Sequence, residues 1–318
     1  MKIWMIVAAS LVALGLILTI VAFALLGFDF KELDMNKCTL NTHKISESFE
    51  NVSIVTDTAE IAILPSTDGQ VRVECFEHKK EIHTVSVQNG TLVIALNDTR
   101  AWYDYISFFS FSKPEITIYL PVVEYGNLTV ESDTGDVVIP KDFSFSGIDV
   151  SLDTGDVQCA ASTTGNMKIK TSTGDIDLEN LSAGALDLRT STGDIEVSSV
   201  VCADSVSFRV STGKTKISAL TCKDLTSVGT TGDLSLENVI VSGLMSIKRD
   251  TGNVNFVGCD AAEIVSHTSP GDVKGSFRSD KIVWAKTDTG RVEVPKSTAG
   301  GRCEITTDTG DIHVEIVP

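Results

Sequence analysis

Hydrophobic and polar residues alternate along most of this chain in short runs that return with a fixed spacing. The clearest run begins two residues after a recurring glycine, where two apolar residues flank a polar one, as in Ile195, Glu196 and Val197. A second run has its apolar residues seven and five positions before the glycine, as at Leu186 and Leu188. Period-two alternation is typical of half-buried β-strands. Each repeat is therefore predicted to contain two short strands separated by a tight turn.

The turn reads Asp-Thr-Gly-Asp or Ser-Thr-Gly-Asp with variants, and its glycine recurs every 19 or 20 residues, a period typical of a solenoid. No intervening stretch carries the 3.6-residue pattern of a crossover helix. We expect equivalent strands to stack in parallel, about 4.8 Å apart, with four apolar columns buried between two sheets. A turn this tight needs a positive φ, which glycine adopts without a Cβ clash. The predicted structural-turn glycines are Gly135, Gly155, Gly174, Gly193, Gly213, Gly232, Gly252, Gly271, Gly290 and Gly310.

Residues 3–28 form an apolar run that is long enough to cross a membrane. Lys2 precedes the run and Asp29, Glu32 and Asp34 follow it, so the positive-inside rule predicts a cytoplasmic N-terminus. A cleaved signal peptide is the alternative, although its apolar region is typically shorter. The predicted fold is thus all-β: a parallel β-solenoid (β-helix-like, two strands per coil of 19–20 residues) preceded by one transmembrane helix. Its predicted parts are residues 1–30 as anchor, 31–127 as irregular opening coils that cap the core, and 128–318 as the regular solenoid.

The predicted cap contains an early copy of the turn in which Ala59 replaces glycine, 76 residues before Gly135, which equals four periods of 19. An aromatic segment also lies there. Its rings could fold over the end of the core, or they could contact the bilayer surface or a partner. The segment comprises Trp102, Tyr103, Tyr105, Phe108, Phe109 and Phe111.

The chain resembles the bacterial family of candidate adhesins known as the domain of unknown function 4097, a β-strand-repeat family related to parallel β-helices. Four repeated runs carry the resemblance: Asp133 to Val137, Asp153 to Val157, Ser172 to Ile176, and Ser191 to Ile195, together with the leading strand Leu128 to Ser132. It covers essentially the whole chain beyond the first forty residues. The resemblance implies a bacterial cell-envelope protein that binds surfaces.

The composition excludes several partners and site types. Lys and Arg number 26 against 43 Asp and Glu, giving a net charge of −17, which disfavours nucleic acid as a partner. The seven cysteines contain no Cys-x-x-Cys pair, so no metal site is expected. Cys202 and Cys222 lie nine residues after successive turn glycines and could come within disulfide reach.

The turns and the outward faces of the strands suggest three kinds of chemistry. Asp-Thr-Gly is also the motif of the aspartic-protease site. Here serine or threonine replaces the aspartate in other copies of the turn, so the aspartate is not expected to be catalytic. Stacked corner carboxylates such as Asp136 and Asp156 could bind calcium or could simply be solvated. Outward residues of the strands could act on polysaccharides, as in β-helix enzymes, although no loop insertion walls a cleft. These residues are Asp177, Arg189, Glu196, Arg209 and Lys216.

The sequence therefore predicts a single-pass, membrane-anchored protein with an extracytoplasmic solenoid. Its expected role is that of a non-enzymatic interaction or structural module of the cell envelope, with no cofactor. The expected partners are the membrane, through the N-terminal helix, and an unidentified envelope protein or surface glycan. The alternative is a sensor or accessory subunit of an envelope-stress system.

Overall fold

The computed structural model describes residues 2–25, 38–100 and 112–317. Within these ranges there is one helix, α1 (Lys2–Leu25), which contains an 18-residue apolar window, Trp4–Val21, with a mean hydropathy of 2.5. None of that window is buried against the rest of the described chain. By length and composition α1 is suited to a single membrane span, and a signal sequence shares these properties.

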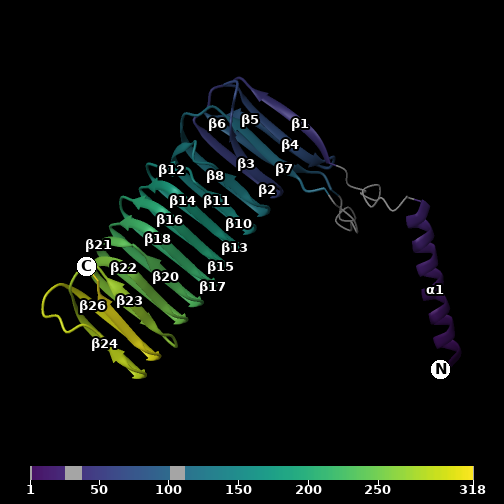
Figure 1. Ribbon diagram of the computed structural model, residues 1–318. Helices are drawn as coiled ribbons and strands as arrows, with labels where there is room; N and C mark the ends of the chain where they lie inside the picture. The colour runs from purple at the N-terminus through teal and green to yellow at the C-terminus, as the bar shows by residue number, and fades with distance from the viewer. Residues whose placement is uncertain (1, 26–37, 101–111, 318) are drawn as a thin grey trace.

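The rest of the described chain is built from strands stacked as a long ladder (Figure 1). In each regular coil, one strand ends directly before the corner glycine and the next begins two residues after it. The strands of the repeat region are β8 (Glu124–Thr134), β9 (Val137–Ile139), β10 (Ser144–Thr154), β11 (Val157–Cys159), β12 (Ser162–Thr163), β13 (Asn166–Thr173), β14 (Ile176–Ala183), β15 (Ala185–Thr192), β16 (Ile195–Cys202), β17 (Ser205–Thr212), β18 (Thr215–Cys222), β19 (Asp224–Thr231), β20 (Leu234–Glu237), β21 (Ile240–Thr251), β22 (Val254–Thr268), β23 (Val273–Phe277), β24 (Lys281–Thr289), β25 (Val292–Glu293), β26 (Gly301–Thr309) and β27 (Ile312–Ile316).

Successive coils pair in parallel and in the register that the repeat predicts. Leu186 of β15 lies beside Val206 of β17, and Ile176 of β14 lies beside Ile195 of β16. Ile195 and Val197 are fully buried while Glu196 between them is exposed. The predicted fold class, a parallel β-solenoid with two strands per coil, is confirmed.

The coil has a second corner that the repeat did not predict. Six residues after the corner glycine the backbone enters the left-handed region, with φ of 53° at Asn180, 55° at Ser199 and 52° at Ala219. This bend turns the chain onto a third face, where Leu181 and Val200 are buried. The core therefore contains more inward columns than the four that the sequence predicted.

The N-terminal end of the ladder is made partly of antiparallel strands. Their bounds are β1 (Cys38–Ile45), β2 (Asn51–Thr58), β3 (Glu60–Pro65), β4 (Val71–His78), β5 (Glu81–Gln88), β6 (Thr91–Asp98) and β7 (Glu115–Leu120). Strands β2 and β3 pair in parallel with β8 and β9, so the coil of Ala59 lies directly beside that of Gly135 despite their separation in sequence. Outside them come β6 and β7, and then β5, β4 and β1 in antiparallel pairing.

The C-terminal coils do not stack in chain order. Strand β22 pairs with β26, and β26 pairs on its other side with β24. Strand β27 likewise lies between β23 and β25. The last coil in the sequence is therefore inserted beside the coil of Gly271, and the preceding coil, β24 and β25, forms the outermost rung (Figure 1). The expectation that coils follow one another in sequence order is wrong at this end.

Candidate functional site

The corner glycines lie where the coils come into closest contact. Nine of the ten have φ between 133° and 152°, a region that favours glycine; Gly271 is the exception. A Cβ placed on Gly193 would lie 2.0 Å from the carbonyl oxygen of Gly174 in the neighbouring coil. The same overlap occurs at Gly271, 2.0 Å from the oxygen of Gly252. These corners need glycine both for the backbone angle and for the spacing between coils.

The aspartates that follow the corner glycines form a hydrogen-bonded ladder. The backbone N–H of Asp175 donates to Oδ1 of Asp156 (2.8 Å), and the N–H of Asp194 donates to Oδ1 of Asp175 (2.7 Å). The N–H of Lys214 continues the ladder with Oδ1 of Asp194 (2.6 Å). Further along, Asn253 takes the same role by accepting from the N–H of Asp272 (2.9 Å). One side-chain oxygen, from a carboxylate or from the amide of Asn253, joins adjacent coils at each of these corners, which is a folding role.

The predicted partner-contact segment lies outside the described residues. It comprises Trp102, Tyr103, Tyr105, Phe108, Phe109 and Phe111, and its role stays a prediction.

A shallow groove of about 420 Å³ crosses the outer face of the strands that follow the corner glycine, β9, β11, β14 and β16. Gln158, Asp177, Glu179 and Glu196 line it, together with the apolar edge of Val138. Partial burial raises the pKa of Asp177, and the carboxylates around it, Glu196 first among them, raise it further. The groove therefore offers hydrogen-bond acceptors and negative charge over several adjacent rungs.

The outward basic residues that were weighed for catalysis are largely paired with acids. Lys216 Nζ lies 2.5 Å from Glu196 Oε1, and Arg189 Nη2 lies 2.5 Å from Asp187 Oδ2. Glu196 also lies directly beside Asp177 in the register of β14 and β16, and both carboxylates line the groove. Asp187 and Arg189 lie on β15, outside the groove.

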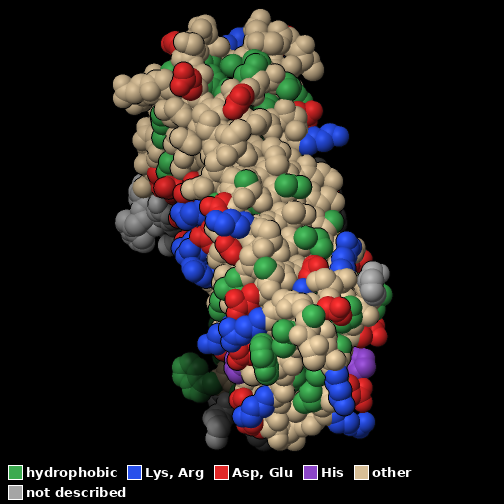
Figure 2. All heavy atoms as spheres, turned by 90° about the vertical axis from the view of Figure 1, so that its left-hand side faces the viewer, with side chains coloured by type: hydrophobic (Ala, Val, Ile, Leu, Met, Phe, Trp, Pro, Cys, Tyr) green, Lys and Arg blue, Asp and Glu red, His purple; other side chains and the backbone are tan. Residues whose placement is uncertain are grey.

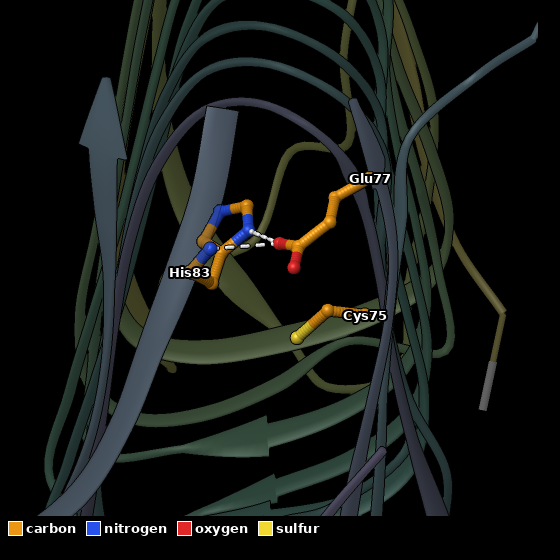
Figure 3. A group of neighbouring side chains, drawn as sticks. All are labelled: Cys75, Glu77 and His83. Carbon is orange, nitrogen blue, oxygen red and sulfur yellow. Dashed lines mark hydrogen bonds and ion pairs between the residues drawn. The ribbon is translucent and has the colours of Figure 1, made fainter. Parts of the chain in front are cut away.

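The most concentrated polar chemistry in the described chain lies inside the N-terminal end of the ladder. Cys75 and Glu77 are alternate, inward-facing residues of β4, and His83 points inward from β5 (Figure 3). Their exposed fractions are 0%, 1% and 3%. One ligand-capable atom from each of the three lies within 4.8 Å of those of the other two. A buried carboxylate at this position requires partners, because an isolated one costs several kcal/mol.

The cluster is held by a network of short hydrogen bonds. Oε2 of Glu77 lies 2.7 Å from both the backbone nitrogen and Nδ1 of His83. Oε1 of Glu77 accepts from Nδ2 of Asn41 on β1 (2.6 Å). The other ring nitrogen of His83, Nε2, lies 2.8 Å from Oγ1 of Thr56 on β2. Four strands thus fix the orientation of one imidazole and one carboxylate.

The burial of these side chains limits the reactions that they can perform. A hydroxyl, an imidazole and a carboxylate contact one another in the sequence of a catalytic triad, here from Thr56, His83 and Glu77. Thr56 is only 4% exposed, however, and Glu77 and His83 are buried as well. Burial also raises the pKa of the Cys75 thiol to about 12, so the sulfur is not a free thiolate. The arrangement suits ligand or proton binding inside the fold better than reaction with an external substrate.

Sequence reasoning missed this cluster. The available signal was the alternation of Val73, Cys75 and Glu77, which places a glutamate at an inward position of a strand. Its partner His83 comes from the opposite side of the core, and nothing in the 19-residue repeat places these two residues together.

The two cysteines weighed as a disulfide lie in adjacent rungs of the third face, and both are buried thiols in the structure. Sγ of Cys202 contacts the carbonyl oxygen of Gly184 at 3.1 Å. Burial raises the pKa of Cys222 to about 12. Both therefore pack as small apolar side chains.

The family model named Toastrack DUF4097 matches residues 49–314. The chain belongs to this family. No protein among the curated ones matches it.

Two solved structures with the same fold come from Parabacteroides species. A "putative adhesin" from Parabacteroides merdae is 13% identical, with a TM-score of 0.52 over 89% of this chain and 98% of its own. A "putative lipid binding protein" from Parabacteroides distasonis is 15% identical, with a TM-score of 0.52 over 87% of this chain and 97% of its own. At these identities the similarity establishes the fold alone.

Proposed function

We propose that this protein is a membrane-anchored, extracytoplasmic β-solenoid that serves as a non-enzymatic interaction module of the cell envelope. The proposal rests on one combination of features. An apolar N-terminal helix precedes a regular ladder whose outer faces are long and flat. The inward columns form the core, so the outward residues of the strands are the surface available to a partner.

The outer surface suits a broad contact better than catalysis. In the lower half of Figure 2, acidic and basic side chains lie intermingled, with polar and a few apolar side chains between them. Several of the charges pair across adjacent rungs, as Lys168 does with Asp149 (3.1 Å). The regular spacing of outward polar and charged side chains along the ladder suits a repeating partner such as a surface glycan, or the extended face of an envelope protein.

The groove around Asp177 is the contact region that we favour. Its carboxylates and the amide of Gln158 accept and donate the hydrogen bonds that sugar hydroxyl groups and basic side chains require. The structural neighbours support interaction in general terms, because their names refer to adhesion and to lipid binding. Neither neighbour specifies the partner of this chain.

Capture of the full-length protein from crosslinked membranes tests the proposal. We expect recovery of an envelope protein or a surface glycan, reduced when Asp177 and Glu179 are both replaced by lysine. A matched double replacement by lysine at Asp149 and Asp187, on the other outer face, should leave capture unchanged.

A discrete signalling protein as the captured partner would favour the sensor or accessory role, and recovery of lipid alone would favour lipid binding. Turnover of an envelope polysaccharide by the purified protein would contradict the non-enzymatic proposal.

A further inference from the structure

The end of the ladder contains a set of side chains that fits a metal ion. Cys75 and Glu77 on β4 and His83 on β5 point into the same space between the two sides of the core (Figure 3). Thiolate, carboxylate and imidazole are the three protein ligand types that bind zinc. We propose that Cys75, Glu77 and His83 form a buried zinc site that fastens the β4–β5 segment to the end of the solenoid.

The residues around the three ligands have the arrangement of supporting groups in metal sites. A metal-bound imidazole usually donates its second N–H to a fixed acceptor, and Oγ1 of Thr56 lies 2.8 Å from Nε2 of His83. This contact directs Nδ1 of His83 toward Glu77 and the centre of the cluster. Asn41 holds the other carboxylate oxygen at 2.6 Å, which fixes the rotation of the carboxylate.

Charge balance favours a divalent ion in this position. With a metal bound, the thiolate of Cys75 and the carboxylate of Glu77 carry two negative charges and the imidazole of His83 none. A divalent cation neutralises the set, so no net charge is buried. Without a metal, protons take the place of the cation: the thiol keeps its proton, and the 2.7 Å contact between Nδ1 of His83 and Glu77 needs a proton between the two atoms.

The site is distinct from a catalytic zinc centre. All three ligands are at least 97% buried, by their exposed fractions of 0%, 1% and 3%. Three protein ligands leave the fourth position of a tetrahedral zinc ion to a water molecule, as in catalytic centres, but burial would close that position to a substrate. The ligands come from strands that cover the N-terminal edge of the ladder, so a bound ion would stabilise this cover against strand addition.

Cobalt titration of the full-length protein in detergent, under reducing conditions, tests the proposal. We expect one equivalent of Co²⁺ to produce a thiolate-to-cobalt charge-transfer absorption that one equivalent of Zn²⁺ abolishes. Because binding releases at least the Cys75 proton, the apparent affinity should rise at least tenfold per pH unit below neutrality. Zn²⁺ should also raise the melting temperature.

Matched variants separate this site from the other cysteines. Cys75→Ser should lose the absorption, and Thr56→Val should keep it with about 10- to 100-fold weaker binding. Cys303→Ser is the control, because Cys303 is equally buried and burial also raises the pKa of its thiol to about 12. Cys38→Ser is a second control, because Cys38 Sγ lies 3.2 Å from His78 Nδ1. Both controls should bind cobalt as the wild type does.

The proposal is overturned if the wild type gives no thiolate absorption. It is equally overturned if the absorption survives in a folded Cys75→Ser protein, or if it disappears in the Cys38→Ser protein. The far-ultraviolet circular dichroism of each variant verifies that it is folded.

Discussion

At the scale of single residues, the corner glycine combines two requirements that can be separated by substitution. Gly193 has a φ of 143° and no room for a Cβ, whereas Gly69 has a φ of 72° and nothing within 4 Å of the added atom. Gly69→Ala should therefore cost only the backbone strain, about 1–2 kcal/mol. Gly193→Ala should cost about 3 kcal/mol or more, because strain and overlap with Gly174 add. Denaturant unfolding of the two variants measures the difference, and equal losses would contradict the packing argument.

The aspartate after each corner glycine gives a second residue-scale prediction. Asp194 accepts a hydrogen bond from the next coil, and Asn253 performs the same role elsewhere in the ladder. Asp194→Asn should consequently lie within about 0.5 kcal/mol of the wild type, whereas Asp194→Ala should lose about 0.5–1 kcal/mol. The check is thermal unfolding in chelator and in calcium. A melting temperature that rises saturably with calcium in the wild type, and less in Asp194→Asn, would identify the corner as a cation site.

The pKa of Asp177 predicts a pH-dependent effect. Burial and neighbouring carboxylates raise this pKa in the folded protein, so ionisation of Asp177 opposes folding. Below the unfolded-state pKa the side chain is neutral in both states, and Asp177→Asn should match the wild type. As the pH rises through the folded-state pKa, the wild type loses stability relative to the variant. The melting temperature of Asp177→Asn should therefore exceed that of the wild type at pH 7, and the excess should shrink toward about pH 3.

Asp149→Asn is the control for this effect, because Asp149 pairs with Lys168 and should be stabilised by remaining charged. An advantage of Asp177→Asn that is the same at every pH would contradict the electrostatic explanation.

The sequence predicted inward residues well wherever they follow the repeat, and poorly where polar residues take inward positions. Ile195 and Val197 could be placed because hydrophobic alternation reflects burial directly. Arg249 could not, although it is 1% exposed. Its guanidinium fills the space left by the missing side chain of Gly229 and donates to Ser227 (2.9 Å). This compensation between two adjacent coils, like the contact between Glu77 and His83, depends on side-chain partners that no spacing rule specifies.

At the scale of elements, the strands on both sides of the glycine corner were predictable and the second corner was not. The first corner repeats one short sequence motif, because its positive φ and the close approach of the neighbouring coil both require glycine. The second needs only a left-handed residue, and Asn180, Ser199 and Ala219 all meet that need. The residue identities vary, so no motif marks the bend. The periodic pattern also cannot specify the order of coils, because every coil offers the same parallel edges to its neighbours.

The inverted order of the last two coils makes a prediction about their contacts. Glu263 of β22 lies beside Arg302 of β26, and the two form an ion pair at 2.8 Å. Stacking in chain order would instead place Ile282 beside Glu263. A protein with Glu263→Cys and Arg302→Cys should therefore form a disulfide on oxidation, since adjacent strands lie about 4.8 Å apart.

The pair Glu263→Cys and Ile282→Cys should not form one, because β26 lies between these strands. Peptide mass spectrometry without reduction identifies which cysteine pair has formed a disulfide. A disulfide in the second pair alone would show that the coils stack in sequence order.

At the scale of the whole molecule, the ladder has different ends. The N-terminal end is covered by antiparallel strands and contains the Cys75, Glu77 and His83 cluster, while the C-terminal end is finished by a coil that is less buried than the one beneath it. Between the ends, outward polar and charged side chains recur with the spacing of the rungs, as at Asp177, Glu196 and Lys216. This organisation suits the long contact surface that the proposed interaction module requires.

The most direct test of this account is the location of the solenoid relative to the membrane. Intact cells should be labelled with a membrane-impermeant amine reagent, and the purified protein should then be analysed by mass spectrometry. Lys113 and Lys286 are 81% and 77% exposed and report on the two ends of the ladder. We expect both to be modified before lysis in a protein that retains residues 1–25. Modification only after the membrane is permeabilised, or a mature chain that begins after the apolar run, would contradict a membrane-anchored extracytoplasmic solenoid.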